Sequence, residues 1–225
     1  MTNKQTVAVF DMDRTITRSG TFSPFLLHFC RTNKAKYVHV PYILGSMIAY
    51  KAGFFSRKAL KERMLDSFLA GLPRRDVSAY ARSFLQHLLD NDGFCPGALK
   101  AIAGHKDAGH TLVIATASMD FYVEVIAAHL GFDHIVATGS CWTPEDTLTR
   151  EIIGENCYGS GKLDMVKKAL PDIDMARENY HVIAYSDHHT DMPLFNWADV
   201  AVAVNPNSKL TKLAGQKGFQ LDNWH

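Results

Sequence analysis

Short runs of apolar residues, rich in valine, isoleucine and alanine, recur along this chain and constrain its fold more than any other feature. They occupy residues 6–10, 112–115, 134–137, 181–184 and 200–204. Runs that stay apolar at consecutive positions are typical of strands buried on both faces of a sheet. Helical patterns at residues 97–108, 120–130 and 161–170 lie between them. This alternation predicts an α/β fold, in which a Rossmann-like parallel sheet is flanked by helices.

One long stretch interrupts the alternation. Residues 16–92 carry almost no strand signal and show helical patterns instead, at 57–69 and 77–89. We therefore expect an all-helical domain inserted after the first strand. The expected boundaries give a core of residues 1–15 and 93–225 and an insertion of residues 16–92.

Composition narrows the function classes. The chain has 225 residues, 47% of them apolar, which is enough to bury one substantial core. Its 24 basic and 23 acidic residues nearly balance, so no overall field favours nucleic acid, and we expect no nucleic-acid partner. The four cysteines form no CxxC pair and are expected to be reduced and mostly buried. The N-terminal sequence lacks the pattern of a secretory signal, so a cytoplasmic location is expected.

The most apolar segment is residues 37–55. Its uncharged part, residues 37–50, is too short to span a bilayer and contains Pro41 and Gly45. We interpret the segment as a buried or interfacial helix pair and expect no integral membrane span. Contact with a membrane surface is the alternative interpretation.

Two carboxylates follow the first strand, in the sequence Asp11-Met12-Asp13-Arg14-Thr15. Ligands of parallel α/β sheets bind at the carboxyl ends of the strands. A divalent cation offsets the repulsion between carboxylates that meet there, and oxygen ligands favour Mg²⁺. A helix N-cap or a surface turn is the structural alternative for an Asp pair.

Two further sites suit an anion. Thr116, Ala117 and Ser118 end the next strand, where small residues let backbone N–H groups approach an oxyanion. Lys162 opens a later helix, and a cation at a helix N-terminus opposes the helix dipole unless an anion lies between them. A helix cap and a solvent-exposed lysine are the respective alternatives.

Acidic residues also follow the strand predicted at 181–184. Asp187 would complete a cation site with the first two carboxylates. Asp191 is expected either to bind a metal-bound water or to anchor the loop. His188 and His189 lie between them, and we interpret both as surface loop residues rather than ligands of zinc or manganese.

In this order, the four sites resemble the motifs of the haloacid dehalogenase superfamily of phosphatases. The matching residues are Asp11, Asp13 and Thr15 for DxDx[TV], Thr116 for the second motif, Lys162 for the third, and Asp187 and Asp191 for DxxxD. The helical insertion resembles the family's C1 cap, and the chain is most similar to the phosphoserine-phosphatase-like branch, subfamily IB. It departs from that branch at Arg14, where a small residue is usual, and at Ala117 and Ser118, where two glycines are usual.

The resemblance implies a Mg²⁺-dependent phosphatase that acts on a small phosphate ester, either phosphoserine-like or another amino-alcohol or lipid-derived phosphate. It implies that Asp11 is the nucleophile and forms an aspartyl-phosphate, and that Asp13 is the general acid and base. The implied metal ligands are Asp11, Asp13 through its backbone carbonyl, and Asp187. The implied phosphate-binding residues are Thr116, Ala117, Ser118 and Lys162, supported by Thr15 and Asp191. The cap would exclude water and select the substrate.

Three alternatives stay open. A phosphotransferase of the same family would pass the phosphate to an alcohol better than to water. A receiver-type phospho-acceptor module also has acids after its first strand, but it lacks the large insertion. A DHH phosphoesterase, suggested by Asp187-His188-His189, would carry a further domain after that motif.

Overall fold

The computed structural model describes residues 4–170 and 176–225 and contains a seven-stranded sheet in the order β4-β3-β2-β1-β5-β6-β7. All neighbouring strands are parallel except β3 and β4, which form an antiparallel pair. The strands are β1 (Gln5–Phe10), β2 (Thr111–Met119), β3 (His134–Trp142), β4 (Leu148–Ile153), β5 (Tyr180–Ser186), β6 (Val200–Val204) and β7 (Gln220–Asp222). The predicted α/β class with a parallel sheet is confirmed.

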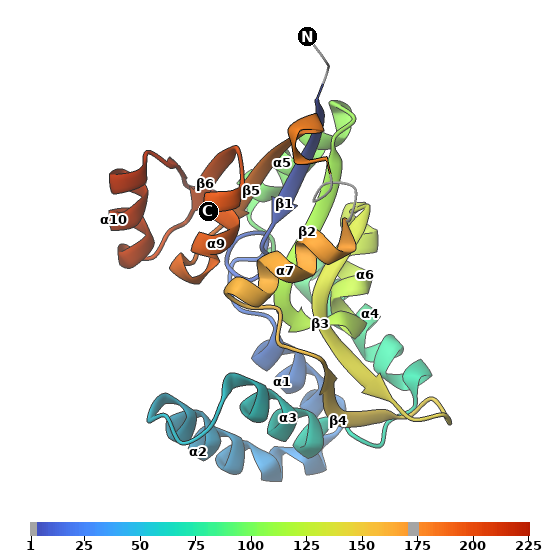
Figure 1. Ribbon diagram of the computed structural model, residues 1–225. Helices are drawn as coiled ribbons and strands as arrows, with labels where there is room; N and C mark the ends of the chain where they lie inside the picture. The colour runs from blue at the N-terminus through green and yellow to red at the C-terminus, as the bar shows by residue number, and fades with distance from the viewer. Residues whose placement is uncertain (1–3, 171–175) are drawn as a thin grey trace.

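Helices cover both faces of this sheet and form a separate group beyond one end of it (Figure 1). The α-helices are α1 (Phe22–Thr32), α2 (Val40–Lys51), α3 (Arg57–Phe68), α4 (Arg74–Asp90), α5 (Pro96–Asp107), α6 (Asp120–Leu130), α7 (Ser160–Ala169), α9 (Met192–Trp197) and α10 (Ser208–Lys217). Short 3-10 helices are η1 (Lys34–His39), η2 (Arg177–Asn179) and η3 (His189–Asp191). The helix predicted at 120–130 coincides with α6, which ends at Gly131 in the left-handed conformation with a φ of 72°.

The two faces of the sheet are buried in different hydrophobic clusters, because successive side chains of a strand point to opposite faces. On β1, Ala8 and Phe10 belong to one cluster, together with residues of α5 and α6. Val7 and Val9 belong to the other cluster, together with residues of α7, α9 and α10. This burial on both faces explains why β1 is apolar at consecutive positions.

The pairing register of β1 aligns the ends of three strands. Phe10 pairs with Ile114 of β2 and with Tyr185 of β5. The residues that follow these three positions therefore lie at one edge of the sheet, at its carboxyl end. This alignment brings together sequence motifs that are more than a hundred residues apart.

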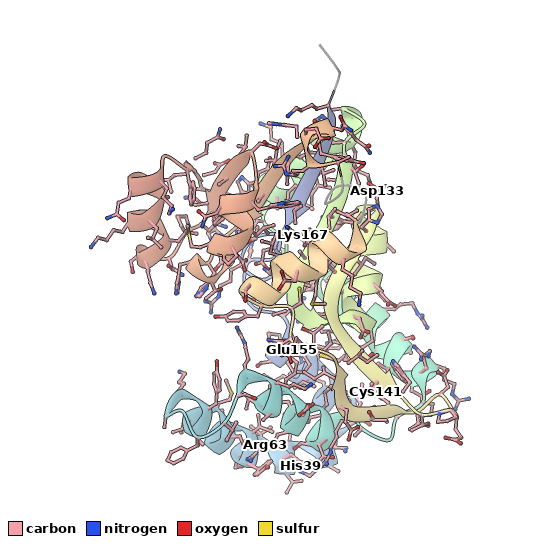
Figure 2. The ribbon with its side chains drawn as sticks, viewed as in Figure 1. His39, Arg63, Asp133, Cys141, Glu155 and Lys167 are labelled. Carbon is pink, nitrogen blue, oxygen red and sulfur yellow. The ribbon has the colours of Figure 1, made fainter. Side chains whose placement is uncertain are left out.

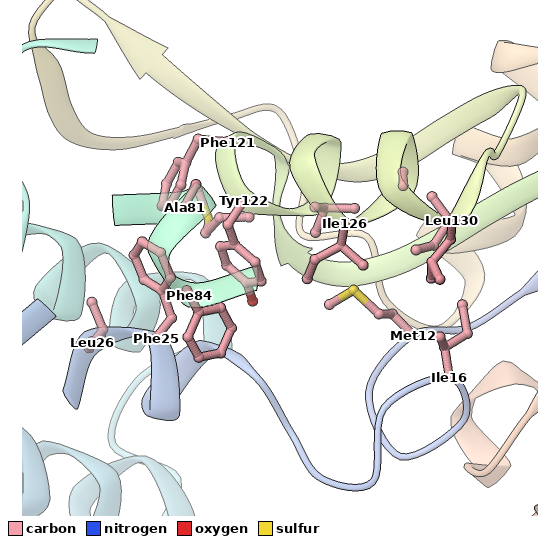
Figure 3. Close-up of a cluster of buried hydrophobic side chains, with 14 of the residues drawn as sticks. Met12, Ile16, Phe25, Leu26, Ala81, Phe84, Phe121, Tyr122, Ile126 and Leu130 are labelled. Atoms are coloured by element: carbon pink, nitrogen blue, oxygen red, sulfur yellow. The ribbon is translucent and has the colours of Figure 1, made fainter. Parts of the chain in front are cut away.

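An aromatic cluster joins the inserted helices to the sheet domain (Figure 3). The ring of Phe25 on α1 stacks on Tyr122 of α6 at 4.9 Å between centroids and meets Phe84 of α4 edge-on at 5.4 Å. Aromatic pairs of this kind add about 0.5–1.5 kcal/mol to the burial of their area. The helix α4 thus packs against the sheet domain, and α3 lies beside β4 at the end of the sheet (Figure 1). The division of the chain at residues 92 and 93 stays a prediction.

The apolar segment at residues 37–55 is mostly not buried, so of the two positions expected for it, buried or interfacial, only the interfacial one stays a prediction. It forms the end of η1, then α2, in which only Ile43 and Ser46 are buried. Ile48 on α2 is 70% exposed, and Phe54 in the turn that follows is 81% exposed. Apolar composition indicates burial only when neighbouring elements cover the residue, and here much of the helix surface is uncovered. Across the described ranges, no helix is long and apolar enough to cross a bilayer.

The cysteines behave as predicted. All four are free thiols. Cys30, Cys95 and Cys157 are buried, and Cys141 is partly buried.

Candidate active site

The acidic residues predicted to act together do meet at the carboxyl edge of the sheet. The backbone N–H of Asp11 donates to the carbonyl of Tyr185 at 2.9 Å, which extends the β1–β5 pairing by one residue. The Thr15 hydroxyl lies 3.3 Å from Asp11 Oδ2 and accepts a hydrogen bond of 3.0 Å from the backbone N–H of Asp187. Thr15 therefore ties the loop after β1 to the loop after β5.

A buried cation neutralises this cluster. Lys162 Nζ donates to Asp11 Oδ1 at 2.8 Å and to Asp191 Oδ2 at 2.7 Å. Asp191 Oδ2 also accepts a 2.7 Å hydrogen bond from the Ser186 hydroxyl, so Asp191 is fixed from two sides. Both Lys162 and Asp191 are only 2% exposed, which makes the pair a buried, charge-assisted contact. Both roles predicted for Asp191, binding a metal-bound water and anchoring the loop, stay predictions.

Burial shifts the pKa values of the charged groups. Burial raises the pKa of Asp11 to about 6, although the charge of Lys162 acts in the opposite direction. Burial raises the pKa of Asp187 further, to about 8, and the nearby carboxylates of Asp11 and Asp191 add to this shift. For Lys162, burial alone would lower the pKa, but the two carboxylates outweigh it and raise the pKa above its usual value. The site therefore holds a lysine that stays protonated. The positive charge near its carboxylates is too small to keep their pKa values low.

Asp13 is fixed by hydroxyl groups and not by a cation. Its Oδ1 accepts hydrogen bonds of 2.7 Å from both the backbone N–H and the hydroxyl of Thr21, and its Oδ2 accepts one of 2.7 Å from the Ser118 hydroxyl. The hydroxyl of the buried Tyr122 lies 2.9 Å from that of Thr21 and continues the network. The side chain of Asp13 thus faces the inserted helices, and both of its side-chain oxygens already accept hydrogen bonds.

The loop after β1 contains a strained residue. Arg14 has a φ of 65°, in the left-handed region that residues with a side chain seldom adopt. Such conformations persist where surrounding contacts impose them, and they cluster at functional sites. Its side chain is exposed and lines the candidate site, so the position at which the family pattern usually has a small residue carries a cation here.

Two adjoining cavities lie over these residues. A cavity of about 270 Å³ is lined by Asp11, Lys162, Asp187 and Asp191 among others. A second cavity, of about 510 Å³, extends beneath α2 and α3. Five residues line both cavities, namely Asp13, Arg14, Gly20, Arg57 and Ala117. The carboxyl edge of the sheet therefore opens into a larger cavity beneath α2 and α3.

The predicted phosphate-binding residues are placed differently from one another. Ala117 lines both cavities, and Lys162 lines the smaller one. Ser118 lines only the larger cavity, where its hydroxyl binds Asp13. The Thr116 hydroxyl accepts a 3.1 Å hydrogen bond from the Ser118 backbone N–H and lines neither cavity. The phosphate-binding role of Thr116 stays a prediction.

The sequence offers the basic residues of α3 as residues that would help the cap select a substrate, and one of them is buried at the site. These residues are Arg57, Lys58, Lys61 and Arg63. Lys61 of α3 is 7% exposed, and its ammonium donates to the carbonyl of Ala117 and to Asn156 Oδ1, with the Thr138 hydroxyl 3.4 Å away. Burial lowers its pKa to about 7, and the nearby Arg57 adds to this effect. Lys61 thus connects the cap to the backbone that lines both cavities. Its position in a run of basic residues gave no signal that it was the buried one.

The two loop histidines are less exposed than predicted. His188 lines the smaller cavity, and its Nδ1 lies 2.8 Å from the Thr190 hydroxyl. His189 is partly buried as well. Burial lowers the pKa of both rings, which favours their neutral forms.

The donor set fits a hard divalent cation. Asp187 is 7% exposed, and its carboxylate accepts no hydrogen bond from the residues described by the structure. A buried carboxylate in that situation is stabilised by a nearby cation, and carboxylate and carbonyl oxygens suit Mg²⁺. Within the described ranges, no three His, Cys, Asp or Glu side chains are arranged to hold an ion. Backbone or water oxygens would therefore have to complete the ligand set of Asp11 and Asp187.

A model of the haloacid dehalogenase-like hydrolases matches residues 8–196, and the chain belongs to this family. A probable phosphatase of Mycobacterium tuberculosis is 29% identical over 96% of this chain and 74% of its own length. The phosphoserine phosphatase SerB1 of the same organism is 25% identical over 95% of this chain and 69% of its own. A crystal structure of a Bordetella pertussis protein of unknown function matches with a TM-score of 0.88 and 24% identity, covering 99% of this chain and all of that one. Family and relatives together place this enzyme among the phosphatases of the family.

Proposed function

We propose that this phosphatase is a Mg²⁺-dependent phosphomonoester hydrolase that works through an aspartyl-phosphate on Asp11. The observation that carries the proposal is the contact of Lys162 with Asp11 at 2.8 Å, at the rim of a cavity that also holds Asp187. A carboxylate attacks a phosphate dianion poorly because like charges repel. A buried, fully charged lysine beside that carboxylate reduces the repulsion.

In the first step, an Asp11 oxygen forms a bond to phosphorus while the bond from phosphorus to the leaving alkoxide oxygen breaks. Asp13, in its protonated form, gives its proton to that oxygen. In the second step, Asp13 takes a proton from water, the water oxygen bonds to phosphorus, and the bond to Asp11 breaks. The hydrogen bonds from Thr21 and Ser118 support this role, because they aim the Asp13 carboxyl at the junction of the two cavities.

Asp11, the backbone carbonyl of Asp13 and Asp187 are the residues that would hold Mg²⁺. When bound, the ion supplies positive charge that offsets the charge of the phosphoryl oxygens. The remaining support comes from the chain itself. Lys162 and the backbone around Ala117 face the same cavity, and the cap limits the access of water to it.

The test is Asp11→Asn, assayed by phosphate release from p-nitrophenyl phosphate with Mg²⁺ present. We expect turnover to fall by at least about a thousandfold while the circular dichroism spectrum is unchanged, because an amide cannot act as the nucleophile. The matched control is Asp164→Asn, since Asp164 is an exposed aspartate on the same helix as Lys162. Full activity of Asp11→Asn would reject the nucleophile. A single round of phosphate release without turnover would favour a phospho-acceptor module.

A further inference from the structure

The charge of the chain is balanced overall but not locally. Residues 14–61 contain nine Arg and Lys residues and no Asp or Glu. This stretch includes the loop after β1, α1, α2 and the first residues of α3. It supplies most of the wall of the larger cavity. The larger cavity is therefore bounded mostly by a segment of the chain that contains no carboxylate.

The wall of this cavity combines apolar side chains with cations. Its apolar part includes Phe22, Met47, Tyr50, Leu60 and Met64. Its cationic part consists of Arg14, Lys51, Arg57 and Lys61. Among the described residues, the one acid that lines it is Asp13, whose two oxygens already accept hydrogen bonds from Thr21 and Ser118. An ammonium group in this cavity would therefore face four cations and a single carboxylate that already has hydrogen-bond donors.

Three of the four cations are available to a ligand. The ammonium of Lys61 is engaged by Ala117, Thr138 and Asn156. Arg14, Lys51 and Arg57 are exposed, and none of them forms an ion pair within the part of the chain that the structure describes. The Arg57 guanidinium carbon lies 4.2 Å from the centroid of the Tyr158 ring. The Arg57 side chain lines both cavities. In Figure 2 the labelled Glu155 marks the segment between β4 and α7 that runs from the cap to the core beside this region.

We propose that the leaving group of the substrate is an apolar segment that carries a second negative charge, and that leaving groups bearing an ammonium are disfavoured. The inference rests on the proposed phosphomonoesterase activity and names the substrate class of the same site. The cavity volume of about 510 Å³ agrees with a leaving group larger than that of phosphoserine. The apolar wall would contact the apolar segment of the leaving group, and the available cations, Arg14, Lys51 and Arg57, would pair with its negative charge.

The test is a matched series of phosphomonoesters on one hexyl chain: hexyl phosphate, the phosphate ester of hydroxyhexanoate, and the phosphate ester of aminohexanol. The value of kcat/KM is measured with Mg²⁺ by phosphate release, with p-nitrophenyl phosphate as the reporter of basic activity. We expect the carboxylate ester to exceed hexyl phosphate by about tenfold, the size of one charge-assisted hydrogen bond. The ammonium ester and phosphoserine are expected to fall below hexyl phosphate.

The substitution Arg57→Met separates charge recognition from general damage. We expect it to reduce the ratio of kcat/KM between the carboxylate ester and hexyl phosphate to about one, through a higher KM for the carboxylate ester. The control is Lys58→Met on the same helix. Lys58 donates to the Gly154 carbonyl at 2.7 Å and lines neither cavity, so the ratio should not change.

Two results would overturn the inference while leaving the phosphatase activity in place. One is an ammonium ester or phosphoserine with the highest kcat/KM of the series. The other is a carboxylate ester no better than hexyl phosphate in the wild type. If no ester is hydrolysed, p-nitrophenyl phosphate included, the proposed function itself fails and this inference fails with it.

Discussion

The substitution Asp187→Asn should stabilise the protein when no divalent metal is present. Asp187 is almost fully buried near Asp11 and Asp191, and its pKa is raised from 3.8 to about 8, first by burial and then by those carboxylates. Below pH 3.8 the side chain is protonated in both the folded and the unfolded state. As the pH rises toward 8, the unfolded chain releases this proton and the folded chain keeps it, so the free energy of unfolding falls. An asparagine removes that loss.

The size of the effect follows from the same pKa. A change from 3.8 to about 8 corresponds to an upper limit of about 5–6 kcal/mol at high pH. Because Asp11 and Asp191 share the interaction, we expect about half of this limit, roughly 2–3 kcal/mol. For a chain of this length that is an increase in Tm of about 5–10 °C at about pH 8.5, and a much smaller one at about pH 5.

The assay is thermal unfolding in a chelator at the two pH values, with Asp164→Asn as the control for loss of an aspartate. Added Mg²⁺ should reverse the order, because it stabilises the wild type through a ligand that the variant lacks. The reasoning would be refuted by wild-type and variant Tm values that stay parallel between the two pH values. It would also be refuted by a metal-free wild type that is more stable than the variant at the higher pH.

Three further outcomes follow from the site. Lys162→Met should cost about 3–5 kcal/mol of stability in urea unfolding at neutral pH, because Asp11 and Asp191 would be left buried without their cation; an unchanged midpoint would contradict this. Ser118→Ala should lower kcat about tenfold with little change in KM and alter the pH profile, since it removes a 2.7 Å hydrogen bond that positions Asp13; a change in KM alone would place Ser118 on the substrate. Among alkyl phosphates with an uncharged leaving group, kcat/KM should rise about tenfold from ethyl to hexyl, because the longer chain makes more contact with the wall formed by Met47 and Met64; equal values would show that the apolar wall does not touch the leaving group.

The elements that could be predicted from the sequence are those whose signal is local. The run at 200–204 is apolar throughout and coincides with β6, and the helix at 120–130 ends where Gly131 permits the left-handed turn. The rule that parallel strands end at one edge applies to Asp11 and Asp187, which follow β1 and β5. Lys162 lies in the first turn of α7, after the antiparallel β4, so its contact with Asp11 was expected from the resemblance of the motifs and not from the strand pattern.

Other features could not be predicted because they depend on packing between distant segments. Whether α2 is covered depends on its neighbours, and its apolar composition could not decide between the buried and the interfacial position that were both expected. The contacts of Thr21 with Asp13 and of Lys61 with Ala117 connect the inserted helices to the sheet edge. Threonine and lysine are common on helix surfaces, so neither of these two contacts could be inferred from a single sequence.

The contact of Lys61 also restrains the movement of α3 away from the edge of the sheet. If α3 moves outward, the ammonium must leave the oxygens of Ala117, Thr138 and Asn156 and become hydrated. The Ala117 carbonyl would then keep only the Thr138 hydroxyl, at 2.8 Å, as its donor, on the stretch of backbone that faces the phosphoryl group in the proposed reaction. An outward movement of α3 would thus change the hydrogen bonding of the surface that receives the substrate.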